Sequence, residues 1–197
     1  MSGLFVTFEG IDRSGKTTQA RMLCQALGDD CLPVREPGGT EVGERVRELL
    51  KDPALEIGPG AEALLFAAAR AELVARVIRP ALDEGRVVVC DRFLDSSLAY
   101  QGAARGLGVE EVARVNAVAT GGLEPDLTFL LWIQPEAAAG RAGQADRFEH
   151  EGAALQEAVL RGYEGIAGGG RWRRVDAARP PAEVHAEVLA EVRAARS

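Results

Sequence analysis

A short apolar run, a glycine loop and an amphipathic segment follow one another near the start of the chain, and this order restricts the fold strongly. Residues 4–8 read LFVTF, a run short enough to be a buried strand that ends next to glycine. Gly10 to Thr17 match the pattern G-x-x-x-x-G-K-T, and residues 16–27 space their apolar side chains as a helix does. Strand, loop and helix in this order are the context that the motif requires, so we predict a phosphate-binding loop (P-loop).

The residue types of this loop suit the phosphates of a nucleotide. Closely spaced backbone N–H groups and the N-terminus of the following helix bind β- and γ-phosphates. The Lys16 ammonium would reach between those phosphates, and the Thr17 hydroxyl would bind Mg²⁺. A tight turn would explain the glycines, but it would not explain the adjacent lysine and hydroxyl. Lys16 and Lys51 are also the only lysines among 23 basic residues.

The rest of the chain alternates predicted strands with predicted helices. Strands are expected at 31–35, 86–90, 126–133 and 171–176, and helices at 41–50, 59–84, 95–103, 109–120, 153–167 and 181–195, with a bend or break at Pro80. This alternation predicts an α/β protein, a three-layer P-loop NTPase fold with a five-stranded parallel sheet flanked by helices. We expect a single domain over 1–197. Ligands bind such sheets beyond the carboxyl ends of the strands, which here are Phe8, Arg35, Cys90 and Ile133.

Charge and composition exclude several classes of protein. The net charge of −7 disfavours nucleic acid as a partner, because binding its backbone needs clustered positive charge. Cys24, Cys31 and Cys90 are odd in number and form no C-x-x-C pair, so we expect free, apolar thiols in a reducing compartment and neither zinc nor disulfides. The chain begins without a signal-peptide pattern and no apolar run is long enough for a membrane span, which favours the cytoplasm and no membrane partner.

Two stretches outside the loop could bind a second substrate. Phe66 and Arg70 are four residues apart on one helix face, where a ring could stack on a base and a guanidinium could bind a phosphate. From spacing alone, a core phenylalanine and a solvated arginine are the more frequent interpretation. Asp91 and Arg92 end a predicted strand at the functional edge, where they suit metal or phosphate binding, although a salt-bridged loop would look the same.

A third set of polar residues lies just downstream. Ser97, Tyr100 and Gln101 are spaced to share one helix face. Gln101 has both a donor and an acceptor with which to read the edge of a base, and Tyr100 could pack on a sugar. Each of these residues, taken alone, is more often structural than functional.

Taken together, these motifs resemble the thymidylate kinase family over nearly the whole chain. The resemblance rests on FEGIDRSGKTTQ, REPGGT (35–40), LLFAAAR (64–70), CDRFLDSSLAYQG (90–102) and DRFE (146–149). P-loops occur in many families, whereas this ordered set is specific. The resemblance implies transfer of the γ-phosphoryl of ATP to dTMP, giving dTDP and ADP in dTTP biosynthesis, with Mg²⁺ and as a homodimer.

The resemblance also implies roles for individual residues. Asp12 would contact the sugar 3′-hydroxyl and help to order the metal region, the Phe66 ring would stack on thymine, and Tyr100 would face the sugar 2′ position. The residues implied to bind dTMP are Asp12, Glu36, Pro37, Phe66, Arg70, Arg92, Ser97, Tyr100 and Gln101, with Arg70 and Arg92 on its phosphate. Those implied for ATP are Gly10, Ile11, Asp12, Arg13, Ser14, Gly15, Lys16, Thr17, Thr18, Arg141, Arg147, Asp176 and Ala177. The catalytic set is Asp12, Arg13, Lys16 and Arg92, and the metal set is Thr17 and Asp91.

Arg13 is unusual because it stands inside a loop whose walls are backbone. An arginine that reaches the transferred phosphoryl group can contribute about 10³–10⁵ in rate, and we expect this role for Arg13 over that of a solvated surface arginine. In the family, lids rich in arginine accompany P-loops that lack one. Here the expected lid (138–152) is short and has only Arg141 and Arg147. The chain departs from the family pattern at Ala69, where aspartate is common, and at Leu73, where histidine is common.

Other functions remain open from the residues alone. One alternative is a kinase for a deoxynucleoside or another monophosphate, although two arginines beside a neutral nucleoside would lack a charged partner. Another is a nucleotide-binding regulator without catalysis, for which Arg13 would be dispensable. A GTPase is disfavoured because no N-K-x-D segment is present, and a DNA-binding regulator conflicts with the net charge.

Overall fold

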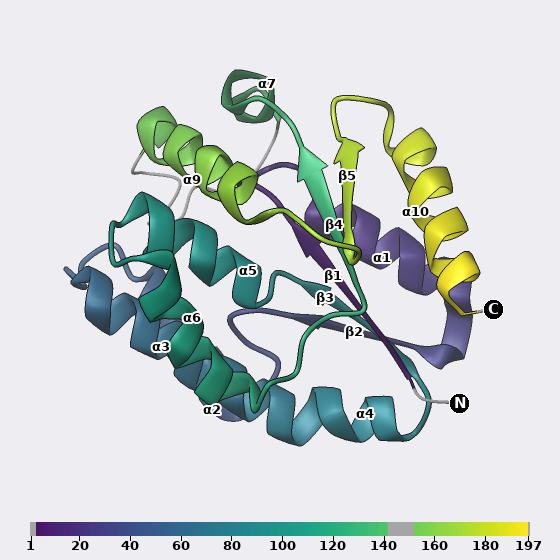
Figure 1. Ribbon diagram of the computed structural model, residues 1–197, viewed down its shortest axis with the longest axis horizontal. Coiled ribbons are helices and arrows are strands. Elements are labelled where there is room, and N and C mark those ends of the chain that lie inside the picture. The colour runs from purple at the N-terminus through teal and green to yellow at the C-terminus, as the bar shows by residue number, and fades with distance from the viewer. Residues whose placement is uncertain (1–2, 142–151, 197) are drawn as a thin grey trace.

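A single parallel sheet forms the centre of the molecule (Figure 1). The structure is a computed structural model that describes residues 3–141 and 152–196. Its five strands lie in the order β2-β3-β1-β4-β5. Their bounds are Leu4–Glu9 (β1), Cys31–Arg35 (β2), Val87–Asp91 (β3), Leu127–Trp132 (β4) and Trp172–Asp176 (β5). The predicted five-stranded parallel α/β architecture is confirmed.

The helices cover both faces of this sheet (Figure 1). Their bounds are Lys16–Leu27 (α1), Glu41–Lys51 (α2), Pro59–Leu73 (α3), Arg79–Asp83 (α4), Leu94–Ser97 (α5), Val109–Thr120 (α6), Pro135–Ala139 (α7), Gly152–Ile166 (α9) and Pro181–Ala195 (α10). A 3₁₀ turn spans Gly28–Asp30 (η1), and π-helical segments span Val74–Ile78 (η2) and Leu98–Ala104 (η3). Within the described residues, no helix is both long and apolar enough to cross a membrane.

Two expected helices are divided, and one helix was not expected. The segment 59–84 is interrupted by η2 just before Pro80, whose missing N–H cannot donate to the carbonyl of the preceding turn. The segment 95–103 is mainly η3, which holds Tyr100 and Gln101. Helix α7 lies where we expected only the beginning of a lid, and most of that lid, 138–152, lies outside the described residues.

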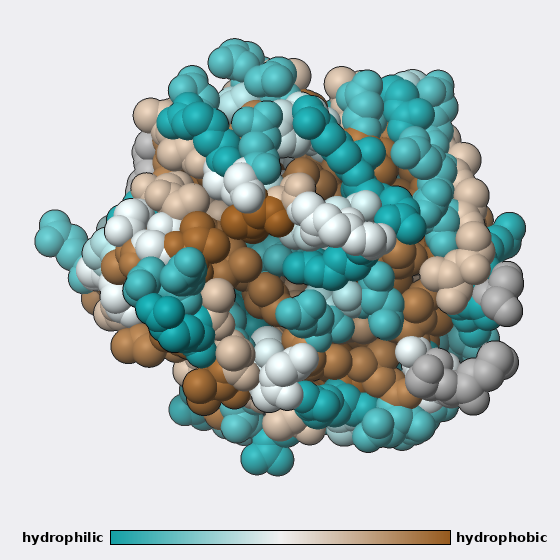
Figure 2. Space-filling model, in the orientation of Figure 1, coloured by the Kyte–Doolittle hydropathy of each residue, from teal (hydrophilic) through white to brown (hydrophobic). Residues whose placement is uncertain are grey.

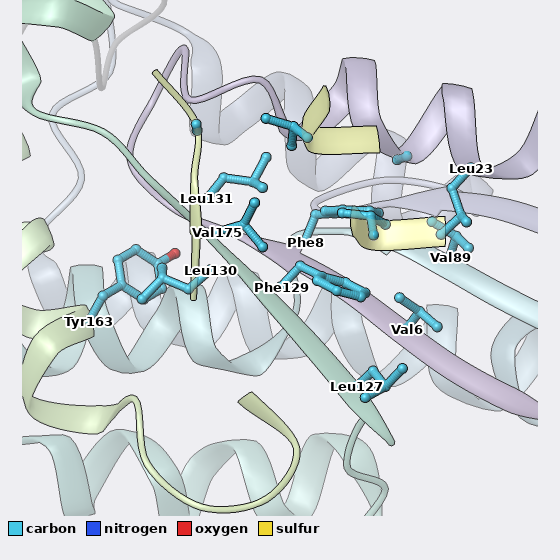
Figure 3. Close-up of a cluster of buried hydrophobic side chains, with 14 of the residues drawn as sticks. Val6, Phe8, Leu23, Val89, Leu127, Phe129, Leu130, Leu131, Tyr163 and Val175 are labelled. Carbon is cyan, nitrogen blue, oxygen red and sulfur yellow. The ribbon is translucent and has the colours of Figure 1, made fainter. Parts of the chain in front are cut away.

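Alternate residues of the strands fill two cores. Phe5, Val88 and Cys90 point to the side of α3 and α4, where they pack with Leu73 and Ile78. Side chains of the opposite parity face α1 and α10, and Figure 3 shows Val6, Phe8, Val89 and Phe129 in one cluster with Leu23 of α1. Because both faces are buried, the strands are apolar throughout, and the carboxyl ends of β1 and β3 bring the P-loop next to Asp91.

The cysteine prediction was wrong for two of the three residues. Cys24 of α1 and Cys31 of β2 form a disulfide, with their Cα atoms 5.2 Å apart. Helix α1 packs beside β2, and the intervening turn η1 reverses the chain, so residues seven apart in sequence meet. Cys90 is free and buried, as expected.

Candidate active site

The P-loop joins β1 to α1 and depends on glycine at two positions. Gly10 has φ +141°, and a Cβ there would lie 2.7 Å from the carbonyl oxygen of Leu131. Gly15 has φ +101° and lies immediately before α1. Arg13 also has a left-handed backbone, with φ +60°, which is costly for a residue with a Cβ. The loop therefore contains local strain at Arg13, a feature that often accompanies function.

Lys16 is folded back onto the loop. Its Nζ donates to the carbonyl oxygens of Gly10 (3.2 Å) and Ile11 (2.7 Å) and to Ser14 Oγ (3.3 Å). Burial, and then repulsion from Arg92, lower the pKa of Lys16 to about 8. A phosphate between the loop and Lys16 would replace some of these neutral acceptors with anionic oxygens and would favour the charged ammonium.

Thr17 and Asp91 form an oxygen pair at the mouth of the loop. Thr17 Oγ1 donates to Asp91 Oδ2 at 2.5 Å. Within 3–141 and 152–196, no cluster of three or more His, Cys, Asp or Glu side chains could hold a metal unaided. Mg²⁺ bound with a nucleotide needs only one or two protein oxygens, because phosphates and water complete its shell. A hydroxyl and a carboxylate side by side therefore fit such an ion.

Two pockets meet at the P-loop. The first, which we call the α3-side pocket, has a volume of about 450 Å³. The second, the α10-side pocket, has a volume of about 650 Å³. Arg13, Lys16 and Thr17 line both pockets. Groups bound in the two pockets would therefore meet beside the same three side chains.

Every residue expected to bind dTMP lines the α3-side pocket. They are Asp12, Glu36, Pro37, Phe66, Arg70, Arg92, Ser97, Tyr100 and Gln101, and Asp91 joins them. Sequence reasoning missed other residues in the lining, among them Arg47 and Lys51 of α2. Their spacing of four residues on one helix face was a usable signal, as was the rarity of lysine in this chain.

Arg70 is the most completely buried charged residue of this pocket, with 1% of its surface exposed. Its five N–H groups donate to Glu36 Oε2 (twice), Ser97 Oγ, Asn116 Oδ1 and the Phe93 carbonyl. The solvated alternative for Arg70 is therefore excluded. Contact with a phosphate requires one of these bonds to be exchanged, and it stays a prediction.

The two departures from the family pattern are buried next to this network. Ala69 is 1% exposed and packs in a small core with Val46 and Leu50. Leu73 is fully buried, and a Cβ on Gly39 of the REPGGT loop would come within 2.7 Å of its side chain. Ala69 is thus packed against α2, and Leu73 against the REPGGT loop.

Arg92 lies at the carboxyl end of β3 in a left-handed conformation, with φ +71°. Its guanidinium donates to the Gly10 carbonyl (3.1 Å), to Tyr100 Oη (3.1 Å) and to Asp12. Although burial opposes it, the positive charges of Arg92 and then Lys16 lower the pKa of Asp12 below its usual value. Asp12 therefore stays ionised and orients Arg92 across the P-loop.

One buried and one partly buried side chain support these residues and were not expected from the sequence. Glu9 accepts hydrogen bonds from Phe93 N (2.8 Å) and Tyr163 Oη (2.8 Å), and burial is the largest cause that raises its pKa to about 7. Gln156 of α9 makes two bonds to Asp12, accepting from its N–H (3.0 Å) and donating to its carboxylate (2.8 Å). Glu9 directly precedes the P-loop, but its partners Phe93 and Tyr163 are distant in sequence, as Gln156 is from Asp12, so no local pattern marks these contacts.

The α10-side pocket contains most of the residues expected to bind ATP. They are Arg13, Ser14, Gly15, Lys16, Thr17, Thr18, Arg141 and Ala177. Gly10, Ile11 and Asp12 do not line it: Ile11 is fully buried, and Asp12 lines the α3-side pocket instead. Asp176 is exposed outside the lining. Residues 178 and 179, from the segment expected near the adenine, also line this pocket. The remaining lining residues had not been assigned: they are Gln19, Leu131, Pro180, Pro181 and Val184. Arg147 lies outside the described residues.

Arg13 and Arg141 connect the loop to the end of α7. Arg13 donates to the carbonyl oxygens of Ala139 (3.3 Å) and Arg141 (3.4 Å). Arg141 donates back to the carbonyl oxygens of Arg13 (3.3 Å) and Ser14 (3.1 Å) and to that of Ala177. Arg13 thus lies across the α10-side pocket and does not extend into solvent.

Comparisons with known proteins agree on one family. A sequence model described as thymidylate kinase matches residues 8–188. Curated thymidylate kinases from Pelotomaculum thermopropionicum and Deinococcus radiodurans are 49% and 46% identical, each over 96% of this chain and over 92% and 96% of their own. A crystal structure of the thymidylate kinase from Ehrlichia chaffeensis has 32% identity and a TM-score of 0.79, covering 98% of this chain and 99% of that one.

Proposed function

The chain belongs to the thymidylate kinase family, and we propose that it binds dTMP in the α3-side pocket and ATP in the α10-side pocket. It is a dTMP kinase, a phosphotransferase that converts ATP and dTMP to ADP and dTDP. The single observation that carries the two-pocket assignment is that both pockets share Arg13, Lys16 and Thr17. A phosphoryl group that passes between them would not leave these three side chains.

Positioning and charge stabilisation would supply the catalysis. The dTMP phosphate is already an anion, so the reaction needs no strong general base. Asp12 would orient Arg92 toward the acceptor phosphate, and Arg13 and Lys16 would stabilise the charge that develops on the transferred group. Their contacts with loop carbonyls would be exchanged for phosphate oxygens, which are stronger acceptors because they are charged.

We assign the metal by the same reasoning. Thr17 and Asp91 would hold Mg²⁺, which neutralises phosphate charge when it is bound. The domain would be single; the lid that we expected over 138–152, with Arg147, lies mostly outside the described residues. The 176–179 segment would contact the adenine, because Ala177, Ala178 and Arg179 line the α10-side pocket.

The remaining assignments concern the base and sugar of dTMP. Phe66 would stack on thymine, Ser97 and Gln101 would face the base edge, and Tyr100 would face the sugar. Glu36 and Pro37 would complete the wall as part of the REPGGT loop. Arg70 fits a second phosphate contact only if one of its five hydrogen bonds is released.

An acceptor panel tests this proposal. Purified protein with ATP and Mg²⁺ would be offered dTMP, dUMP, UMP, CMP, AMP and thymidine separately, and ADP and diphosphate product would be followed. We expect the highest kcat/KM for dTMP, with no transfer to thymidine because Arg92 and Lys16 need a phosphate. Preference for another acceptor would refute the base assignments. ATP binding without transfer to any acceptor would favour a regulatory protein.

We also propose that the chain is a homodimer in the cytoplasm. Large apolar side chains are exposed on three helices that pack side by side, namely Val42 and Leu49 of α2, Leu64 of α3 and Val118 of α6. Figure 2 shows apolar surface between hydrophilic side chains on this side of the molecule. A second copy of the chain would cover these side chains and remove them from water.

A further inference from the structure

Gln101 has one defined orientation in the α3-side pocket. It belongs to η3, is 1% exposed and donates through Nε2 to Glu62 Oε1 of α3 at 2.8 Å. Its carbonyl oxygen, Oε1, accepts no hydrogen bond from the residues that the structure describes. An amide with its NH₂ group directed into the protein wall has its oxygen left for a ligand.

The partner of Gln101 decides this orientation. Glu62 is 1% exposed, and an ionised carboxylate can only accept hydrogen bonds. Arg105 Nε (3.2 Å) and Nη2 (3.3 Å) donate to the same carboxylate, so its oxygens act as acceptors toward both neighbours. If the Gln101 amide were reversed, two oxygens would face each other in a buried site, which costs far more than a lost hydrogen bond.

We propose that Glu62 is a positioning residue that keeps the Gln101 carbonyl oxygen toward the bound base, and that this selects bases with an N3–H group. The proposal rests on the assignment of Gln101 to the base edge. Thymine and uracil have a donor at N3, which the carbonyl oxygen accepts. Cytosine has a lone pair at N3, which would face the carbonyl oxygen and be repelled. Glu62 thus contributes to specificity without contacting the nucleotide.

The test compares kcat/KM for dTMP and dCMP in Glu62→Gln. The substitution keeps shape, but the new amide can donate as well as accept, so Gln101 is free to reverse. Unfilled hydrogen-bonding groups commonly discriminate by about 10²-fold or more, and we expect the dTMP to dCMP ratio to fall by at least about tenfold. The KM for ATP should not change. Glu72→Gln is the matched control, since Glu72 lies on the same helix, pairs with exposed Arg76 and should leave the ratio intact.

The variant Gln101→Leu distinguishes a failure of this proposal from a failure of the assignment of Gln101 to the base edge. If Gln101→Leu leaves the KM for dTMP unchanged, Gln101 does not read the base and its assignment fails. If Gln101→Leu raises that KM but a folded Glu62→Gln retains the parent ratio, only the role of Glu62 is refuted. A fall of the ratio in Glu62→Gln, with the ATP KM preserved, supports the proposal.

A second test uses the unsubstituted protein with altered bases, so it does not require any variant to fold. N3-methyl-dTMP has the shape of thymine elsewhere but lacks the N3 donor. We expect dTMP and dUMP to be used and N3-methyl-dTMP and dCMP to be rejected. Use of dCMP with an efficiency similar to that of dTMP would overturn the proposal.

Discussion

Replacement of Arg13 by glycine should make the protein more stable than replacement by alanine, while both variants lose activity. Arg13 has φ +60°, a conformation that costs about 1–2 kcal/mol for a residue with a Cβ. Glycine removes that cost and alanine does not. Both lose the hydrogen bonds to the Ala139 and Arg141 carbonyls, which are long, at 3.3 and 3.4 Å, and contribute about 0.5 kcal/mol each.

By these magnitudes, the glycine variant should be as stable as the parent protein or slightly more stable, and the alanine variant should be less stable. Arg13→Gly should change the free energy of unfolding by about 0 to +1 kcal/mol and Arg13→Ala by about −1 kcal/mol. For a chain of this size, about 1 kcal/mol shifts the melting temperature by about 2–4 °C. The glycine variant should therefore melt several degrees above the alanine variant.

The catalytic expectation is the same for both variants. Loss of an arginine at the transferred phosphoryl group should lower kcat by about 10³ or more, equivalent to about 4 kcal/mol of transition-state stabilisation. Melting would be followed by calorimetry, and kcat by ADP release at saturating dTMP. A glycine variant that retains kcat within about threefold would refute the catalytic role, since a true contribution is larger by orders of magnitude. An alanine variant as stable as the glycine variant would refute the strain argument.

Three further predictions concern the metal, pH and assembly. Asp91→Asn should raise the Mg²⁺ concentration for half-maximal rate by about 10–100-fold, whereas the KM for dTMP should change little. Because the pKa of Lys16 is lowered to about 8, the free enzyme loses that charge as pH rises through this value; the KM for ATP should therefore rise above about pH 8 and be constant below it, and a flat profile would contradict the role of Lys16. Leu64→Glu should convert a dimer to a 20.9 kDa monomer in light scattering, and a parent protein that is itself monomeric would refute the proposed interface.

Local features of the sequence were sufficient for the strands and for the P-loop, whereas the family motifs supplied most of the site lining. The helix over 16–27 and the strand over 31–35 have the predicted bounds, because apolar periodicity and the flanking glycines act over a few residues. Order along the chain then implied a parallel sheet, and a parallel sheet collects the ends of its strands at one edge. This is why Asp91 and Arg92 could be placed beside the P-loop in advance, whereas Phe66 and Gln101 lie on helical segments and were assigned to the same pocket by the family motifs.

The sequence did not predict which residues form hydrogen bonds with one another in the site. Arg70 was expected to bind a phosphate, yet Glu36, Ser97, Asn116 and Phe93 together take all of its donors. These partners come from the loop after β2, from α5, from α6 and from the loop after β3. No spacing in the sequence records which of them reach the same guanidinium, because that depends on how the elements pack.

The parallel sheet, the P-loop and the residue types that meet at the strand ends follow from the order of motifs along the chain. The tertiary structure alone decided that Cys24 and Cys31 pair, that Glu9 supports the segment after β3, and that Glu62 orients Gln101. The physical reason is the range of the forces involved. Periodicity and turn chemistry act between near neighbours, whereas buried polar groups must find partners wherever packing leaves them, across separations of up to 84 residues in these cases.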